Sequence, residues 1–148
     1  NIDEIGVWRP GSRRFFLDMD GSNSWNAGDA RSASFGWSSD FPVAGNWDGT
    51  GGDNVGVYRQ ANAAFYLDDG NLVWESGVDT AVSAPANVGG YPVIGDWNED
   101  GTDDLGYIET NGTFHLGSIV GGAFVKSDSS LFNAAGDKPI AGNWDEQP

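Results

Sequence analysis

The chain repeats itself with a period of about 50 residues, and this periodicity limits the fold more than any other feature of the sequence. The segments PVAGNWDGTGGDNVGVYR (42–59) and PVIGDWNEDGTDDLGYIE (92–109) align without a gap. A partial copy, PIAGNWDEQP, begins at Pro139, and IGVWRP (5–10) supplies the half that this copy lacks. We therefore expect one repeat domain over 1–148, with three units whose boundaries fall inside an acidic loop: approximately 1–50, 51–100 and 101–148.

Within each unit the apolar residues alternate with a period of two, which is typical of β-strands. The runs are short, rich in β-branched and aromatic residues, and bounded by Gly, Asn, Asp and Pro. One copy predicts four strands, in PVIGDW, LGYIE, TFHLG and AFVKS. No segment has the pattern of an amphipathic helix, and we expect 79–90 to be a long loop. The sequence thus predicts an all-β fold of three four-stranded units.

The most specific motif is the acidic loop DWNEDGTDD (96–104) between the first two expected strands of a unit. Side-chain oxygens stand at loop positions 1, 3, 5 and 9, and a glycine stands at position 6. Calcium takes six to eight oxygen ligands, which alternate residues of a tightly curved loop can supply. We therefore expect Ca²⁺ to bind here, through the side chains of four residues and the backbone carbonyl of a fifth: Asp96, Asn98, Asp100, Asp104 and Thr102.

Two related loops are weaker candidates. The loop NWDGTGGDN (46–54) offers one charged ligand in register among its five positions, which are Asn46, Asp48, Thr50, Gly52 and Asn54. A third loop is divided between the two chain ends, with Asn143 and Asp145 at one end and Asp3 at the other. A solvated acidic turn without metal is the alternative for all three loops.

The combination of GDW or GNW, the loop DxNxDGxxD, and a following LGY or VGVYR resembles the FG-GAP/VCBS-type repeats of integrin-like β-propellers. The bacterial and archaeal variants with PVxGDWDGDGxDxVGVYRP units are most similar. The resemblance implies that each repeat is a four-stranded blade and that the acidic loop binds calcium. This chain departs from the family pattern at Asn46 and Asn143, which replace the aspartate at loop position 1. It also departs at Thr50 and Gln147, which replace the aspartate at loop position 5. A β-trefoil, which also has three repeats of this size, is the alternative fold.

Three blades cannot close a propeller, because propellers use roughly four to eight. Strand edges would remain open and would need to be covered. Either two copies complete a ring, or copies join head to tail in an open fibre. The chain also begins and stops inside an acidic loop, so we expect either a longer tandem protein or a subunit that completes a blade of its neighbour.

Composition excludes several functions. The chain has 7 Lys and Arg against 22 Asp and Glu, a net charge of −15, so nucleic acid is not an expected partner. It lacks cysteine, has a single histidine, His115, and has no apolar run long enough to span a membrane. Because the repeated loops account for the carboxylates, we do not expect an enzyme. High acidity with abundant Gly and Asn suits an extracellular or cell-surface protein.

The expected function is therefore that of an extracellular structural or adhesive repeat protein, stabilised by calcium, whose partners are further copies or further repeats of itself. The alternative is a lectin-like propeller that binds glycans. Trp37, which has no counterpart in the other repeats, is the candidate contact for a sugar. Asn111 begins the sequon NGT and is a candidate for glycosylation.

Overall fold

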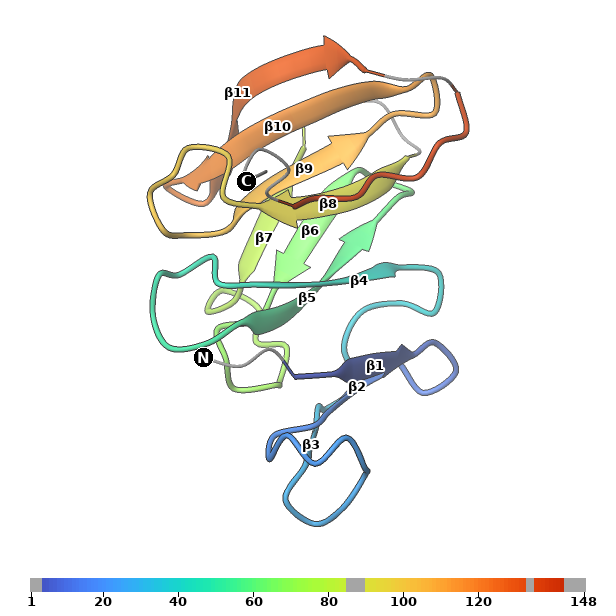
Figure 1. Cartoon of the computed structure of the whole chain (residues 1–148), viewed down its shortest axis with the longest axis vertical. Coiled ribbons are helices and arrows are strands. Elements are labelled where there is room, and N and C mark those ends of the chain that lie inside the picture. Colours follow the sequence, from blue (N-terminus) through green and yellow to red (C-terminus); the bar gives the residue numbers. More distant parts are fainter. Residues whose placement is uncertain (1–3, 85–89, 133–134, 143–148) are drawn as a thin grey trace, which may run out of the picture.

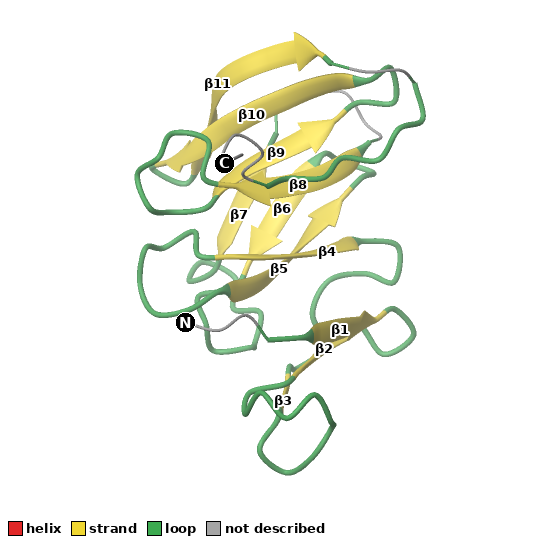
Figure 2. Cartoon of the chain, viewed as in Figure 1, coloured by secondary structure: helices red, strands yellow, loops and turns green. Residues whose placement is uncertain are grey.

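A computed structural model describes residues 4–84, 90–132 and 135–142. Over these residues the regular structure consists of strands alone, joined by loops and turns (Figure 2). The first sheet contains β1 (Gly6–Arg9), β2 (Arg14–Leu17) and β3 (Ala30–Arg31). The second contains β4 (Phe41–Gly45), β5 (Asn54–Arg59), β6 (Ala64–Leu67) and β7 (Thr80–Ser83). The third contains β8 (Tyr91–Gly95), β9 (Asp104–Ile108), β10 (Thr113–Val120) and β11 (Ala123–Leu131).

The three sheets are separate, antiparallel and open, and they follow one another along the long axis of the molecule (Figure 1). In each sheet the strands pair in chain order, as expected of strands joined by hairpins. The second and third sheets share one register, in which Val43 lies opposite Gly56 and Val93 lies opposite Gly106. The sequence repeat is therefore also a repeat in the register of strand pairing.

The first sheet has three strands, whereas the sequence predicts four. Its β1 corresponds in sequence to β5 and β9, so among the described residues no strand of this sheet corresponds to β4 and β8. The prediction of a loop over 79–90 was wrong in part: Thr80–Ser83 forms β7, a short edge strand held by pairing with β6. Residues 85–89 lie outside the described part. Three separate open sheets also differ from the single closed form that the β-trefoil alternative predicts.

Two apolar cores lie between neighbouring sheets. The core between the first and second sheets is built around Phe15, Phe35, Val55 and Val57. The core between the second and third sheets includes Val43, Tyr58, Phe65, Leu67, Leu105 and Tyr107. The second sheet thus contributes to both cores, and the first and third sheets contribute to one each, which gives the hydrophobic stabilisation that a single sheet cannot reach alone.

Adjacent sheets also meet at their first strands. The ring of Phe41, at the start of β4, lies edge-on to the ring of Tyr91, at the start of β8, with their centroids 5.2 Å apart. Lys138 continues this row, since its Nζ lies 3.3 Å from the centre of the Tyr91 ring. The segment that follows Lys138 runs beside β8 as the red trace in Figure 1. Among the described residues there is no helix that could cross a membrane.

Candidate functional site

The acidic loop 96–104 connects β8 to β9 and is organised by its own carboxylates. Both oxygens of Asp96 accept backbone N–H groups, from Asp100 at 3.1 Å and from Gly101 at 2.9 Å. Asp100 accepts hydrogen bonds from the backbone and the hydroxyl of Thr102, and these bonds hold the pKa of the Asp100 carboxyl below its usual value. Asp100 is therefore ionised at neutral pH, and the first half of the loop curves around the carboxylate oxygens of Asp96 and Asp100.

The far end of this loop is Asp104, which is buried at the start of β9. Burial raises the pKa of Asp104, partly offset by hydrogen bonds from Ser118 and from the backbone of Trp97. The nearby charges of Asp100 and Asp96 raise it further. These carboxylates repel one another, so a bound cation would stabilise the loop.

The loop 46–54 has the same backbone conformation at the two positions that define the turn. Gly49 and Gly51 have φ of 71° and 72°, and their equivalents Glu99 and Gly101 have φ of 61° and 86°. Asp48 accepts from the backbone N–H of Thr50 at 2.8 Å, which lowers the pKa of Asp48. The two loops are therefore the same structural element, although 46–54 carries fewer acidic side chains than 96–104.

One contact joins the two loops across neighbouring sheets. The backbone N–H of Asn46 donates to Oδ2 of Asp103 at 2.7 Å, and the backbone N–H of Asp103 donates to the carbonyl of Asn46 at 2.9 Å. The side-chain oxygen of Asn46 is buried and has no hydrogen-bond partner among the described residues. That oxygen is the first position of the expected ligand set, and it is an acceptor with nothing to accept from.

Hydrogen bonds thus organise each of these two loops, but Asp96, Asp100 and Asp104 are not among the groups of three acidic side chains that converge within 4.8 Å in the described part of the chain. The remaining candidates of the divided loop, Asp3, Asn143 and Asp145, lie outside the described residues.

Two aspartate triads, which the sequence analysis missed, could also hold a metal ion. They are Asp18, Asp20 and Asp29 in the loop from β2 to β3, and Asp68, Asp69 and Asp79 in the loop from β6 to β7. Within each triad one carboxylate oxygen of every residue lies within 4.8 Å of the others. The signal was present in the sequence, because FFLD and FYLD each end in an aspartate that has a second aspartate at the same spacing downstream.

The first and last aspartates of each triad also accept hydrogen bonds from the backbone of the loop between them. Asp68 accepts from the backbone of Gly70 and Leu72 through Oδ2, whereas its Oδ1 is buried without a partner among the described residues. Burial raises the pKa of Asp68 despite those bonds, and the charges of Asp79 and Asp69 add to the effect. In the third sheet Gly117 replaces this aspartate and a short hairpin replaces the long loop, so the triad is confined to the first two sheets.

Trp37, the candidate sugar contact, and Asn111, the candidate glycosylation site, are both exposed. Trp37 is 55 % exposed, and the guanidinium of Arg59 lies 3.7 Å from its ring centre. This stacking and a backbone hydrogen bond from Trp37 to Asp40 fix the residue without any ligand. Asn111 lies in the turn between β9 and β10, where its side chain donates to Glu109 and accepts from the backbone of Thr113.

Trp47 and Trp97, in contrast, occupy equivalent positions beside the acidic loops and are held by hydrogen bonds to the backbone. The indole N–H of Trp47 donates to the carbonyl of Asp68, and that of Trp97 donates to the carbonyl of Leu105. Comparison with known proteins adds no assignment: no protein-family model matches this chain, and neither a curated protein nor a solved structure matches it.

Proposed function

We propose that this chain is an extracellular structural repeat protein of the FG-GAP/VCBS type, whose sheets are propeller blades and whose copies assemble with one another. The observation that carries the proposal is the open edge of β1. Ile5 and Val7 are each 60 % exposed there, whereas their equivalents in the other two sheets are buried: Val55, Val57, Leu105 and Tyr107. These equivalent positions are buried where a first strand is present and exposed where none lies beside them, and an exposed apolar edge of this kind favours pairing with a further strand.

The opposite end of the molecule supports the same proposal. Leu131 and Phe132, at the end of β11, and Ile140, in the segment beside β8, are strongly exposed. Apolar surface therefore lies at both ends of the row of sheets. Contacts between unlike ends are heterologous, so they produce a ring when the rotation closes and a fibre when it does not.

The test is the assembly state of the purified chain. Size-exclusion chromatography and electron microscopy in calcium buffer are expected to show rings or filaments, because burial of the exposed ends favours association. A chain that remains monomeric at high concentration, both with calcium and with a chelator, contradicts the proposed function.

Calcium is proposed as the ion of the acidic loops, with 96–104 as the principal site. Asp96 and Asp100 accept backbone N–H groups of one turn there, Asp104 is buried at its end, and the buried, unpartnered oxygen of Asn46 favours a further site in 46–54. Oxygen ligands of this kind suit a hard cation.

Calcium is accordingly expected to stabilise the folded chain. At a free concentration of 100 times the dissociation constant, an ion that binds only the folded state contributes about 2.7 kcal/mol, enough to raise Tm by several degrees. Calorimetry with calcium and with chelator measures this difference. The increment should shrink in Asp100→Ala and persist in Asp128→Ala, which removes an exposed carboxylate from β11. Equal melting curves with calcium and chelator would refute the calcium sites.

A further inference from the structure

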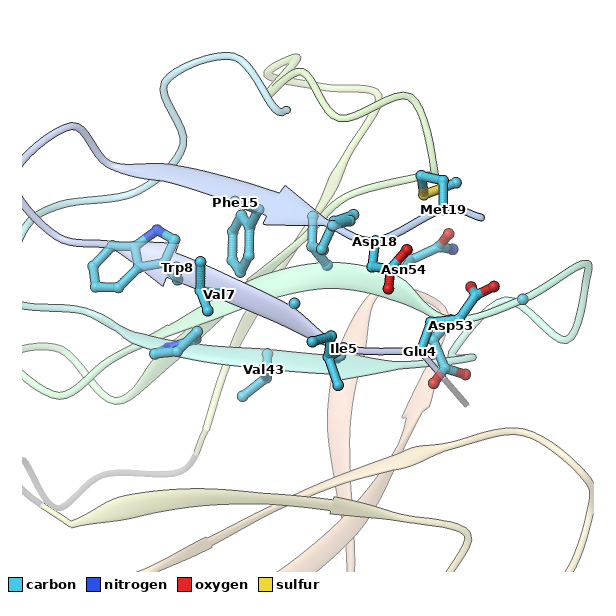
Figure 3. A pocket seen from close by; sticks show the side chains of 16 residues that line it. Glu4, Ile5, Val7, Trp8, Phe15, Asp18, Met19, Val43, Asp53 and Asn54 are labelled. Carbon is cyan, nitrogen blue, oxygen red and sulfur yellow. The ribbon is translucent and has the colours of Figure 1, made fainter. Parts of the chain in front are cut away.

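A groove runs along the open edge of the first sheet. It has a volume of about 820 Å³ and lies between β1 and β4, where Ile5, Gly6 and Val7 face Pro42, Val43 and Ala44 (Figure 3). In the second and third sheets the position beside the corresponding edge is filled by β4 and β8. The groove is therefore the place of a missing first strand.

The glycines of this edge show which side chain the strand would bring. A Cβ added at Gly56 would lie 3.1 Å from Val43, and one added at Gly106 would lie 2.8 Å from Val93. In both sheets the glycine thus makes room for a β-branched residue of the first strand. At Gly6 the three nearest atoms all belong to Phe16 and Leu17 of β2. The contact with β2 is therefore the same, but among the described residues no residue of a first strand lies on the other side of Gly6.

A segment with the required sequence lies at the other end of the same chain. Residues 139–142 read PIAG, against PVAG in β4 and PVIG in β8. Ile140 is 75 % exposed, although its equivalents Val43 and Val93 are 8 % and 6 % exposed. Lys138 lies over the ring of Tyr91, and Tyr91 lies edge-on to Phe41, so this segment follows the first strands of the second and third sheets in one row.

We propose that residues 139–142 of a second copy occupy this groove as the fourth strand of the first sheet. The proposal rests on the proposed function, and it names the surface and the segment through which the copies join. The registers of β4 with β5 and of β8 with β9 give the pairing: Pro139 opposite Val7, Ile140 opposite Gly6, and Ala141 opposite Ile5. Backbone hydrogen bonds would supply affinity, and Ile140 over Gly6 would supply specificity.

The second copy is the occupant because the donor cannot fill its own groove. Its segment lies against the third sheet, beside Ile108 and Phe114, and the second sheet separates it from β1 (Figure 1). Asp53 lines the groove at the position equivalent to Asp103, and Asp103 binds the backbone of Asn46, the residue that follows β4.

The absence of cysteine allows a direct test of this register. Residues directly opposite each other in an antiparallel pair have Cα atoms about 4.5–5.5 Å apart, within the range that a disulfide spans. Two single variants, Ile5→Cys and Ala141→Cys, are purified separately, mixed and oxidised. The mixture is expected to give a disulfide-linked pair of one chain of each kind. The double variant is expected to give covalent dimers if two copies close a ring, or a ladder of multimers if they form a fibre.

The matched control is Glu4→Cys mixed with Ala141→Cys, which keeps Ile140, is shifted by one residue and so directs the first thiol to the opposite face of the strand. All variants change exposed positions, and their melting curves check that they fold. Assemblies without the Ile5–Ala141 crosslink, or with an equal crosslink in the shifted pair, would overturn the donor strand and leave the proposed function standing. A wild-type chain that forms no assembly would overturn both.

Discussion

Arg59→Met is expected to lower the free energy of unfolding by about 3–5 kcal/mol, the usual cost of removing one member of a buried ion pair. Arg59 donates to both carboxylate oxygens of Asp40, at 3.0 and 2.8 Å, and the Asp40 side chain is fully buried. Burial by itself would lower the pKa of Arg59, but the hydrogen bonds and charge of Asp40 outweigh it and raise that pKa. Without its partner, the Asp40 carboxylate would remain in an apolar site.

Arg9 provides the control, because it occupies the position in β1 that Arg59 occupies in β5. It is exposed and lies over the ring of Phe16, with its guanidinium carbon 4.3 Å from the ring centre. Arg9→Met is therefore expected to change stability by no more than about 0.5 kcal/mol. Urea denaturation of the monomeric chain measures both variants. If Arg9→Met and Arg59→Met lower the free energy of unfolding equally, the ion pair with Asp40 is not the source of the loss.

Leu105→Ala is expected to cost about 2–5 kcal/mol, because it opens a cavity in the larger apolar core. Leu105 is fully buried between the second and third sheets, among Val43, Tyr58 and Leu67. A surrounding of long, fixed side chains leaves little opportunity for the site to collapse around the smaller residue. The same denaturation experiment gives the loss, which should appear as a lower midpoint with an unchanged slope.

Ile5→Ala makes the equivalent change in the incomplete sheet and should behave differently. In the monomer Ile5 is mostly exposed, so its truncation should change stability by no more than about 0.5 kcal/mol. In the assembled state the donor strand would cover this residue, so the same truncation should weaken association. If Ile5→Ala lowers the stability of the monomer as much as Leu105→Ala does, the edge of β1 is already covered within one chain.

The sequence was most informative where the signal is local. Alternation in Asn54–Arg59 and Asp104–Ile108 predicts strands, because side chains of a strand point to opposite faces in turn. The repeated Asp, Asn and Gly of the acidic loops predict their shared turn, which depends on backbone conformations within a few residues. β7 was missed for the converse reason: TAVS is short, and its pairing with β6 decides its conformation.

The triads show a different limit. Asp18 and Asp29, like Asp68 and Asp79, are separated by a loop whose path determines whether the carboxylates meet. Their equal spacing in two repeats is visible in the sequence, but spacing across a long irregular loop does not give a distance. Convergence of these groups depends on backbone N–H donors such as those of Gly70 and Leu72, which hold Asp68 in place.

By itself, then, the sequence determined the number of units, most of their strands, their acidic turns and the expectation that three such units leave edges open, because each of these follows from a short repeated pattern. Only the tertiary structure decided which edge is open, and therefore which equivalent residues are buried and which are exposed. Ile5 and Leu105 occupy the same place in the repeat, yet one faces solvent and the other lies in the core. The physical reason is that burial depends on neighbours distant in the chain, and β1 has no first strand beside it within the described residues.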